Sequence, residues 1–209
     1  MTPESAPGAP TDGAPSTSTP DAPASGRVLL DATGIDRSLM RIAHEVIERT
    51  DDPERLYLVA IPNGGVPLAQ RLAANLKQIA DLDVPVGVLD TTLYRDDLLT
   101  RASRPALRRT EMPSAVDDHV VILVDDVVKT GRTIRAAMDA LMDFGRPKAV
   151  QVVGLVDRGH RELPIKLDYV GKNVPTQAEE EVSLLGVDGG PLTVVVHTRD
   201  ASASDGGEG

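Results

Sequence analysis

The sequence predicts an α/β protein whose mostly parallel central sheet is flanked by helices, and three features indicate this fold. Apolar runs of strand length alternate with segments that have the residue spacing of helices, which is the pattern of βαβ units. The apolar runs are hydrophobic at consecutive positions, as expected for strands that are buried on both faces. The 209 residues include no Trp, one Phe and three Tyr, so the core must consist mainly of Val, Leu, Ile and Ala.

The composition limits the number of domains and the chemistry of the protein. A hydrophobic content of 41% over 209 residues is enough for one domain with a substantial core. The absence of Cys excludes disulfides, Cys-based zinc sites and a Cys nucleophile. No apolar run approaches the roughly 20 residues of a membrane span, and the N-terminus lacks the features of a signal peptide. We therefore expect a cytoplasmic protein.

The charged residues are distributed unevenly along the chain. The net charge is −10, but all 22 basic residues lie between Arg27 and Arg199. Six of the 32 acids lie in the two tails, so the body is less acidic than the whole chain. This distribution permits a local basic patch on the body, although it does not demand a nucleic-acid partner.

Two tails flank the expected domain. Residues 1–26 are rich in Ala, Pro, Ser, Thr and Gly, and residues 200–209 have a similar composition. Such segments bury too little apolar surface to offset the entropy lost on ordering, so both are expected to be disordered. The folded domain is expected to span residues 27–199.

The body opens with a short strand and a long helix. The strand is expected at residues 27–31, and Thr33 or Asp36 is the candidate N-cap of the helix that follows. The apolar residues of this helix recur at helical spacing and comprise Ile35, Leu39, Ile42, Ala43, Val46 and Ile47.

The second strand–helix unit leads into a long polar connection. The run LYLVAI (56–61) predicts a strand, PNGG (62–65) a turn, and residues 66–80 a helix. A further strand is expected at residues 84–90. The segment 91–118 is rich in Arg and Asp, and a connection of this length inside a compact domain indicates a functional loop or an extended hairpin.

The remaining elements complete the sheet and add a small β-rich region. Strands are expected at residues 120–125 and 148–156, with a helix at 131–144 between them. Beyond them the chain contains Pro164, Pro175 and a VDGGP turn between EVSLL and LTVVVHT, which predicts a small β-rich addition.

The stretch VVILVDDVVKTGRT carries the strongest indication of chemistry. Asp125 and Asp126 follow an apolar strand, and ligands of open parallel sheets bind beyond the carboxyl ends of the strands. Thr130, Gly131 and Thr133 then open a helix, where unpaired N–H groups and the helix dipole favour an anion. Acceptors for hydroxyl groups or a metal thus stand beside donors for a phosphate, as a sugar phosphate requires. The alternative is an ordinary strand–turn–helix with capping acids.

The common nucleotide-binding motifs are absent from the sequence. The chain contains no GxxxxGK[ST] segment, so a P-loop site is unsupported. It contains no GxGxxG segment either, which leaves a dinucleotide-binding site without support.

The segment VILVDDVVKTGRT (121–133) resembles the phosphoribosyl pyrophosphate (PRPP) signature of type I phosphoribosyltransferases. The segments LMRIAHEVIER, LDTTLYRDDL, FGRPKAVQVVGLVDRGHRELPI and DYVGKNVPT resemble the family of pyrimidine operon attenuation regulators, the PyrR family. The resemblance extends from about residue 27 to about residue 197. It implies a type I phosphoribosyltransferase fold with a small β-rich hood at about residues 157–197, and a homodimer or higher homo-oligomer.

The resemblance also implies two activities. One is uracil phosphoribosyltransferase activity, in which uracil and PRPP give UMP and pyrophosphate, with Mg²⁺ arriving with PRPP and no direct metal ligand from the protein. The other is regulation of pyrimidine genes by transcription attenuation, through sensing of UMP or UTP and binding of pyr leader mRNA.

By the same resemblance, individual residues receive expected roles. Asp125 and Asp126 would hold the ribose hydroxyls, and Arg95 would close over the leaving group; these three are the expected catalytic residues. The residues expected to bind PRPP or UMP are Asn63, Gly64, Gly65, Asp125, Asp126, Val127, Val128, Lys129, Thr130, Gly131, Arg132 and Thr133. Those expected to bind uracil are Val156, Asp157, Arg158 and Val182. Those expected to bind RNA are Arg37, Arg41 and Lys172.

Two positions depart from the family pattern and define the alternatives. The first loop of the family usually reads Thr-Arg-Gly, whereas here it reads Asn63-Gly64-Gly65, like the loop of purine transferases. Lys129 stands where the family usually has Tyr. One alternative is therefore a nucleotide-gated RNA-binding regulator with weak or lost catalysis, and another is a phosphoribosyltransferase for a different base. If the loop limits catalysis, Gly64→Arg is expected to raise activity.

Overall fold

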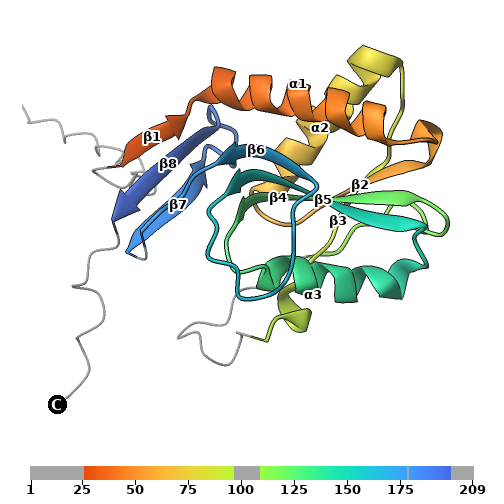
Figure 1. The fold of residues 1–209 in the computed structure, drawn as a ribbon. Coiled ribbons are helices and arrows are strands. Elements are labelled where there is room, and N and C mark those ends of the chain that lie inside the picture. The colour runs from red at the N-terminus through yellow and green to blue at the C-terminus, as the bar shows by residue number, and fades with distance from the viewer. Residues whose placement is uncertain (1–25, 97–108, 178, 199–209) are drawn as a thin grey trace, which may run out of the picture.

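The computed structural model describes residues 26–96, 109–177 and 179–198. Within these ranges, five parallel strands form a central sheet in the order β3-β2-β4-β5-β6. Helices α1 and α2 cover one face of this sheet and α3 covers the other, while a second, antiparallel sheet in the order β1-β8-β7 lies beside it (Figure 1). The predicted α/β class with a parallel central sheet is confirmed.

The elements follow one another in the order expected for βαβ units. The strands are β1 (Arg27–Leu30), β2 (Leu56–Ala60), β3 (Val86–Val88), β4 (Val120–Val128), β5 (Ala149–Asp157), β6 (Tyr169–Asn173), β7 (Glu180–Leu185) and β8 (Thr193–Thr198). The α-helices are α1 (Ala32–Arg49), α2 (Gly65–Ala80) and α3 (Arg132–Leu141). Short 3₁₀ turns are η1 (Pro53–Arg55), η2 (Thr92–Tyr94) and η3 (Met142–Phe144).

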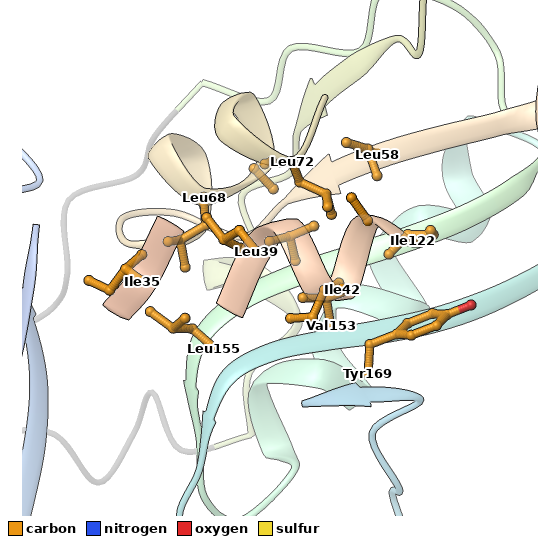
Figure 2. Close-up of a cluster of buried hydrophobic side chains, with 14 of the residues drawn as sticks. Ile35, Leu39, Ile42, Leu58, Leu68, Leu72, Ile122, Val153, Leu155 and Tyr169 are labelled. Carbon is orange, nitrogen blue, oxygen red and sulfur yellow. The ribbon is translucent and has the colours of Figure 1, made fainter. Parts of the chain in front are cut away.

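The central sheet is buried on both faces, which explains the continuous apolar runs in its strands. Along β2, Leu58 and Ala60 join the core beneath α1 and α2, whereas Tyr57 and Val59 join the core beneath α3. Figure 2 shows the first of these cores, in which side chains of α1 and α2 pack onto the sheet. Burying these branched side chains stabilises the fold by roughly 1.5–3 kcal/mol for each one.

Asp31 caps helix α1, so the expectation of Thr33 or Asp36 at this position was wrong. The Oδ1 atom of Asp31 accepts a hydrogen bond from the Gly34 backbone N–H at 2.7 Å. The helix begins as soon as β1 ends, which places Thr33 and Asp36 inside its first two turns. A side chain inside the helix cannot satisfy the N–H groups of the first turn in the way that an N-cap residue can.

Strand β4 extends three residues beyond the expected end at residue 125. It continues because β5 pairs with it along its whole length, with Val127 opposite Val156 and Val128 opposite Asp157. As a consequence, Asp125 and Asp126 lie within the paired part of the strand rather than in the turn that follows.

The small antiparallel sheet is assembled differently from the hood expected at residues 157–197. Strand β6 lies in that range, yet it pairs with β5 as the fifth parallel strand of the central sheet. Strand β1, from the other end of the domain, pairs with β8 and completes the hood. The pairing of β1 with β8 joins residues about 170 positions apart, which local patterns do not encode.

The polar connection at 91–118 is described only at its two ends. Glu111 forms an antiparallel bridge with Val88 through two N–H···O bonds of 2.8 Å, so the returning segment runs along the edge strand β3. The rest of this connection and the two expected disordered tails, apart from Gly26, lie outside the described residues. No helix in the described ranges has both the length and the apolar character needed to cross a lipid bilayer.

Candidate active site

The candidate site is a cleft between the carboxyl end of the central sheet and the hood. A cavity of about 420 Å³ lies over the turn that follows β4, and its lining includes Asp125 and Thr130. A second cavity of about 700 Å³ lies between the start of α2 and strand β7, and its lining includes Gly64. Val127 and Val182 line both cavities, so the two are adjoining parts of one cleft.

The two acids of β4 experience different environments. The Asp125 side chain is buried, with the residue 6% exposed, and burial raises the pKa of this carboxyl group well above its usual range. The neighbouring Asp126 raises that pKa further, while the positive charge of Arg95 opposes the shift. Asp126 donates its N–H to Oδ1 of Asp125 at 3.0 Å. The pair therefore presents hydrogen-bond acceptors to the cleft from a partly dehydrated position.

The turn after β4 has the backbone geometry of an anion site. Gly131 has a φ of 90°, a left-handed conformation that a glycine adopts without strain, and α3 begins at the next residue. The carbonyl of Thr130 accepts hydrogen bonds from the N–H groups of Glu162 and Leu163 at 3.1 and 3.2 Å, which fix the turn against the following segment. The first turn of α3 lines the smaller cavity, and the N-terminal end of a helix favours a phosphate.

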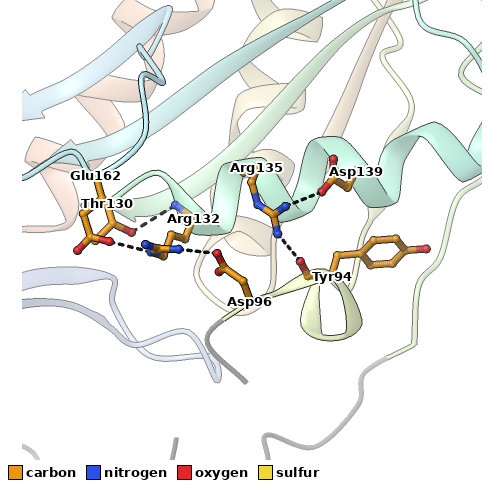
Figure 3. Close-up of polar contacts among 7 residues, drawn as sticks. All are labelled: Tyr94, Asp96, Thr130, Arg132, Arg135, Asp139 and Glu162. Atoms are coloured by element: carbon orange, nitrogen blue, oxygen red, sulfur yellow. Dashed lines mark hydrogen bonds and ion pairs between the residues drawn. The ribbon is translucent and has the colours of Figure 1, made fainter. Parts of the chain in front are cut away.

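Arg132, a residue expected to wrap the phosphate, lines the smaller cavity, and its side chain has acidic partners within the protein. Its guanidinium forms ion pairs with Asp96 and with Glu162, the latter at 2.7 Å (Figure 3). Arg135 donates to the carbonyl of Tyr94 at 2.8 Å and so holds the same segment. The two arginines anchor the start of the long connection to α3.

Arg95 is brought into the cleft, as the sequence predicts. Its Nη1 donates to Oγ1 of Thr133 at 2.8 Å, and the residue lines the smaller cavity. The anchoring of its neighbours to α3 therefore determines where this charge lies.

The loop before α2 is in direct contact with the acid pair. A Cβ atom added at Gly64 would overlap the carboxylate of Asp126 and would lie only 2.7 Å from the Cβ atom of that residue. A Cβ atom at Gly65 would overlap the carbonyl oxygen of Val124. The peptide bond between Pro62 and Asn63 is cis. An arginine at position 64 would displace Asp126, so the expected gain of activity in Gly64→Arg does not fit this geometry.

Some of the residues that were expected to bind uracil line the cleft, and others do not. Val182 and Arg158 line the cleft, but the guanidinium of Arg158 donates to Oγ1 of Thr176 at 3.1 Å and to the carbonyl of Glu180. The expected contact of Val156 with uracil was through backbone groups, and it stays a prediction. The Val156 side chain is fully buried in the core and lines neither cavity. It points to the core because strand residues alternate between the two faces of a sheet.

Asp157 is engaged within the protein rather than aimed at a ligand. Its carboxylate accepts from the Gly159 N–H and pairs with Arg161, each at 2.9 Å. Arg161, which sequence reasoning did not assign to the site, also donates to the carbonyl of Lys129 at 2.7 Å. The VDRGHREL segment indicated the importance of this region, but the partners of its arginines depend on the tertiary fold.

The three residues expected to bind RNA come from α1 and β6, which pack together. Arg41 donates to the carbonyls of Val170 and Gly171 and pairs with Glu45, and Lys172 donates to the carbonyl of Leu29 at 2.9 Å. Among the residues that the structure describes, Arg37 makes only a long side-chain hydrogen bond of 3.4 Å, to the carbonyl of Thr33. Arg41 and Lys172 thus have structural partners, while Arg37 is exposed on the surface of α1.

Comparisons with a family model and with curated proteins both indicate phosphoribosyltransferases. The family model described as phosphoribosyl transferase domain matches residues 28–188. A protein named Bifunctional protein PyrR from Pelotomaculum thermopropionicum is 58% identical over 174 residues, which covers 82% of this chain and 96% of the relative. The protein of the same name from Deinococcus radiodurans is 50% identical and covers 82% and 95%.

Solved structures resemble the chain in fold. The hypoxanthine phosphoribosyltransferase of Trypanosoma cruzi aligns with a TM-score of 0.62 at 18% identity and covers 82% of this chain and 96% of that one. A hypoxanthine-guanine phosphoribosyltransferase from Bacillus anthracis aligns with a TM-score of 0.61 at 20% identity and covers 81% and 96%. At these identities the likeness concerns the fold alone.

We predict that Gly64→Ala weakens the binding of ribose 5-phosphate by about 10- to 100-fold, because the new methyl group displaces Asp126 and misplaced site groups have effects of this size. Isothermal titration calorimetry measures the affinity. Gly190→Ala is the matched control, since a Cβ atom there meets its nearest neighbour at an ordinary 3.5 Å. Equal affinities of the two variants would contradict the steric argument.

We predict that Asp125→Asn stabilises the folded protein at pH 8. A carboxyl group with a raised pKa in the folded state binds more protons folded than unfolded, so its contribution to stability falls as pH rises from the usual carboxyl pKa through the raised one. Asparagine does not ionise, so the variant does not lose stability in this way as the pH rises. Urea unfolding at pH 5 and pH 8 should show a gain that is larger at pH 8. Asp51→Asn, an exposed control, should show no such pH-dependent gain.

Proposed function

The chain belongs to the phosphoribosyltransferase family and, within it, to the bifunctional PyrR proteins, and on this premise we propose how it works. It transfers the phosphoribosyl group of PRPP to uracil, which yields UMP and pyrophosphate, and it regulates pyrimidine gene expression as a uracil-nucleotide-sensing protein that binds pyr mRNA. The observation that carries the enzymatic half is the acid pair of buried Asp125 and partly exposed Asp126, beside the anion-binding turn in a cleft next to the hood.

The cleft supplies what the ribose 5-phosphate group requires. Asp125 and Asp126 accept hydrogen bonds from the two ribose hydroxyls, and the backbone N–H groups at Gly131, Arg132 and Thr133 donate to the 5′-phosphate. These groups are held in place by the sheet and by α3 before the substrate arrives. Most of the catalytic effect then comes from positioning the anomeric carbon and stabilising the positive charge that develops there.

The pyrophosphate group is assigned to the larger cavity. The described residues that line it include Asp126 and Asp188 but no basic residue. Among the described residues, no group of three or more His, Cys, Asp or Glu is arranged to hold a metal ion. By the family resemblance, Mg²⁺ arrives with PRPP and neutralises the charge of the diphosphate. The backbone at Gly64 and Gly65 approaches this group closely because neither residue has a side chain.

Uracil is assigned to the space beneath the hood. Val182 of β7 provides an apolar contact, and Arg158 holds the hood strand through the carbonyl of Glu180. Arg95 enters from the long connection, where its charge favours the ionised form of Asp125 and faces the departing diphosphate.

We place RNA binding on the surface formed by α1 and β6, with Arg37 as its available cation. Regulation of pyr mRNA requires the protein to be in the cytoplasm, and a homodimer would double this surface. The reading as a regulator without catalysis and the reading as a transferase for another base are less favoured, because relatives with 50–58% identity are named as bifunctional PyrR proteins.

We expect the wild-type protein to form UMP from uracil and PRPP, and to use guanine, hypoxanthine and xanthine at least about tenfold less efficiently in kcat/KM. A steady-state assay with each base measures the discrimination. Faster turnover of a purine would support a transferase for another base. Tight binding of UMP without any turnover would support a regulator that has lost catalysis.

We expect Arg37→Ala to weaken binding to a pyr leader hairpin and to leave UMP formation unchanged. Loss of one phosphate contact should reduce the slope of log K against log salt by about one. Filter binding at several salt concentrations, in the presence of UMP, measures both quantities. Arg146→Ala is the matched control on a different surface, and an equal effect of the two variants would argue against α1 as the RNA-binding element.

A further inference from the structure

Among the described residues, four basic ones line the smaller cavity, and one of them differs from the others in its contacts. Arg95 donates to Thr133, Arg132 pairs with Asp96 and Glu162, and Arg158 donates to Thr176 and Glu180. The fourth is Lys129, whose side chain is exposed. Within the part of the chain that the structure describes, its ammonium group has no hydrogen bond or ion pair.

The backbone of Lys129 is nevertheless held firmly. Its carbonyl accepts from Nη1 of Arg161 at 2.7 Å, and Arg161 is fixed in turn by Asp157 at 2.9 Å and by the carbonyl of Ile165 at 3.0 Å. The next residue, Thr130, is held by two further backbone bonds. A residue with a fixed backbone thus lines the cleft and carries a charge that has no partner among the described residues, which is the arrangement expected of a group that meets a ligand.

The position of Lys129 indicates which part of the ligand it meets. The carbonyl of the preceding residue, Val128, accepts the N–H of Arg158 at 3.0 Å, and the Arg158 side chain reaches the hood at Glu180. Lys129 thus lies between the segment that supports the hood and the turn that binds phosphate. That turn already offers backbone donors to the 5′-phosphate, whereas the hood side offers the side chains of Val182 and Glu181, neither of which is a cation.

The chemistry of the reaction supplies a use for a positive charge on the hood side. In the transfer, N1 of uracil forms a bond to the anomeric carbon while the bond from that carbon to the pyrophosphate oxygen breaks with its electron pair. The proton on N1 is released to solvent. Negative charge on the ring is shared with its two carbonyl oxygens, so a cation beside one of them stabilises the nucleophile.

We propose that the Lys129 ammonium group donates a hydrogen bond to a carbonyl oxygen of the uracil ring and is a specificity-determining residue of this chain. The proposal rests on the proposed uracil phosphoribosyltransferase function. It explains how a lysine is accommodated where the family usually has a tyrosine, since both side chains can donate to a carbonyl oxygen, but only lysine adds a full positive charge.

The test compares Lys129→Met, Lys129→Arg and the matched control Lys148→Met, an exposed lysine at the opposite end of the sheet. Calorimetry gives the Kd values of UMP and ribose 5-phosphate, and steady-state kinetics gives separate KM values for uracil and PRPP. We expect Lys129→Met to raise the Kd of UMP and the KM of uracil by about tenfold or more, the effect of losing a charge-assisted hydrogen bond. The Kd of ribose 5-phosphate and the KM of PRPP should change less than about twofold, within the range of surface substitutions.

The remaining variants and outcomes separate the possibilities. Lys129→Arg should recover part of the UMP affinity, and Lys148→Met should match the wild type. Equal weakening of UMP and ribose 5-phosphate would overturn the proposal in favour of a phosphate contact. Unchanged UMP affinity in Lys129→Met would overturn it in favour of a lysine that faces solvent. Failure of the wild type to convert uracil would remove the proposed activity, while the binding measurements would still decide the role of Lys129.

Discussion

The Asp125 and Asp126 carboxyl groups stand side by side at the end of β4, and the first of them is almost completely buried. Such a pair is costly, because burial and mutual repulsion both disfavour the charged forms. The cost is tolerated because β4 is the most extensively paired strand of the sheet, with β2 on one side and the whole length of β5 on the other. The site therefore depends on a strand that the rest of the core holds in place.

The same acids constrain the neighbouring loop. Asp126 occupies the space above Gly64, so that position accepts no side chain while the carboxylate stays where it is. The glycines at positions 64 and 65 therefore do more than replace the arginine of the family pattern, because the position of Asp126 requires a glycine at position 64. They belong to a geometry in which the acid, rather than a cation, fills the space between β4 and the start of α2.

Arginines connect the cleft to its surroundings and determine its shape. Arg132 and Arg135 fasten the start of the long connection to α3, while Arg158 and Arg161 fasten the hood and the segment after β5 to the turn that follows β4. Their planar guanidinium groups satisfy several acceptors at once, often carbonyls at the ends of strands. These arginines all have partners within the protein. Lys129 differs from them, because its ammonium group has no partner in the described part of the cleft.

The sequence by itself determined the fold class, the order of the elements and the chemistry at the end of β4. These properties reside in short segments: branched apolar runs define buried strands, and DDVVKTGRT places acids and an anion-binding turn a few residues apart. Local patterns were less reliable at element boundaries, where strand pairing extended β4 and an adjacent Asp31 capped α1.

Only the tertiary structure decided which distant segments meet. It pairs β1 with β8 in the hood, gives β6 to the central sheet, turns Val156 into the core and brings Gly64 against Asp126. It also pairs the side chains of Arg132 and Arg158 with acceptors inside the protein. The physical reason is that such contacts depend on sheet register, side-chain direction and the packing of elements far apart in the chain, none of which a local pattern of residues specifies.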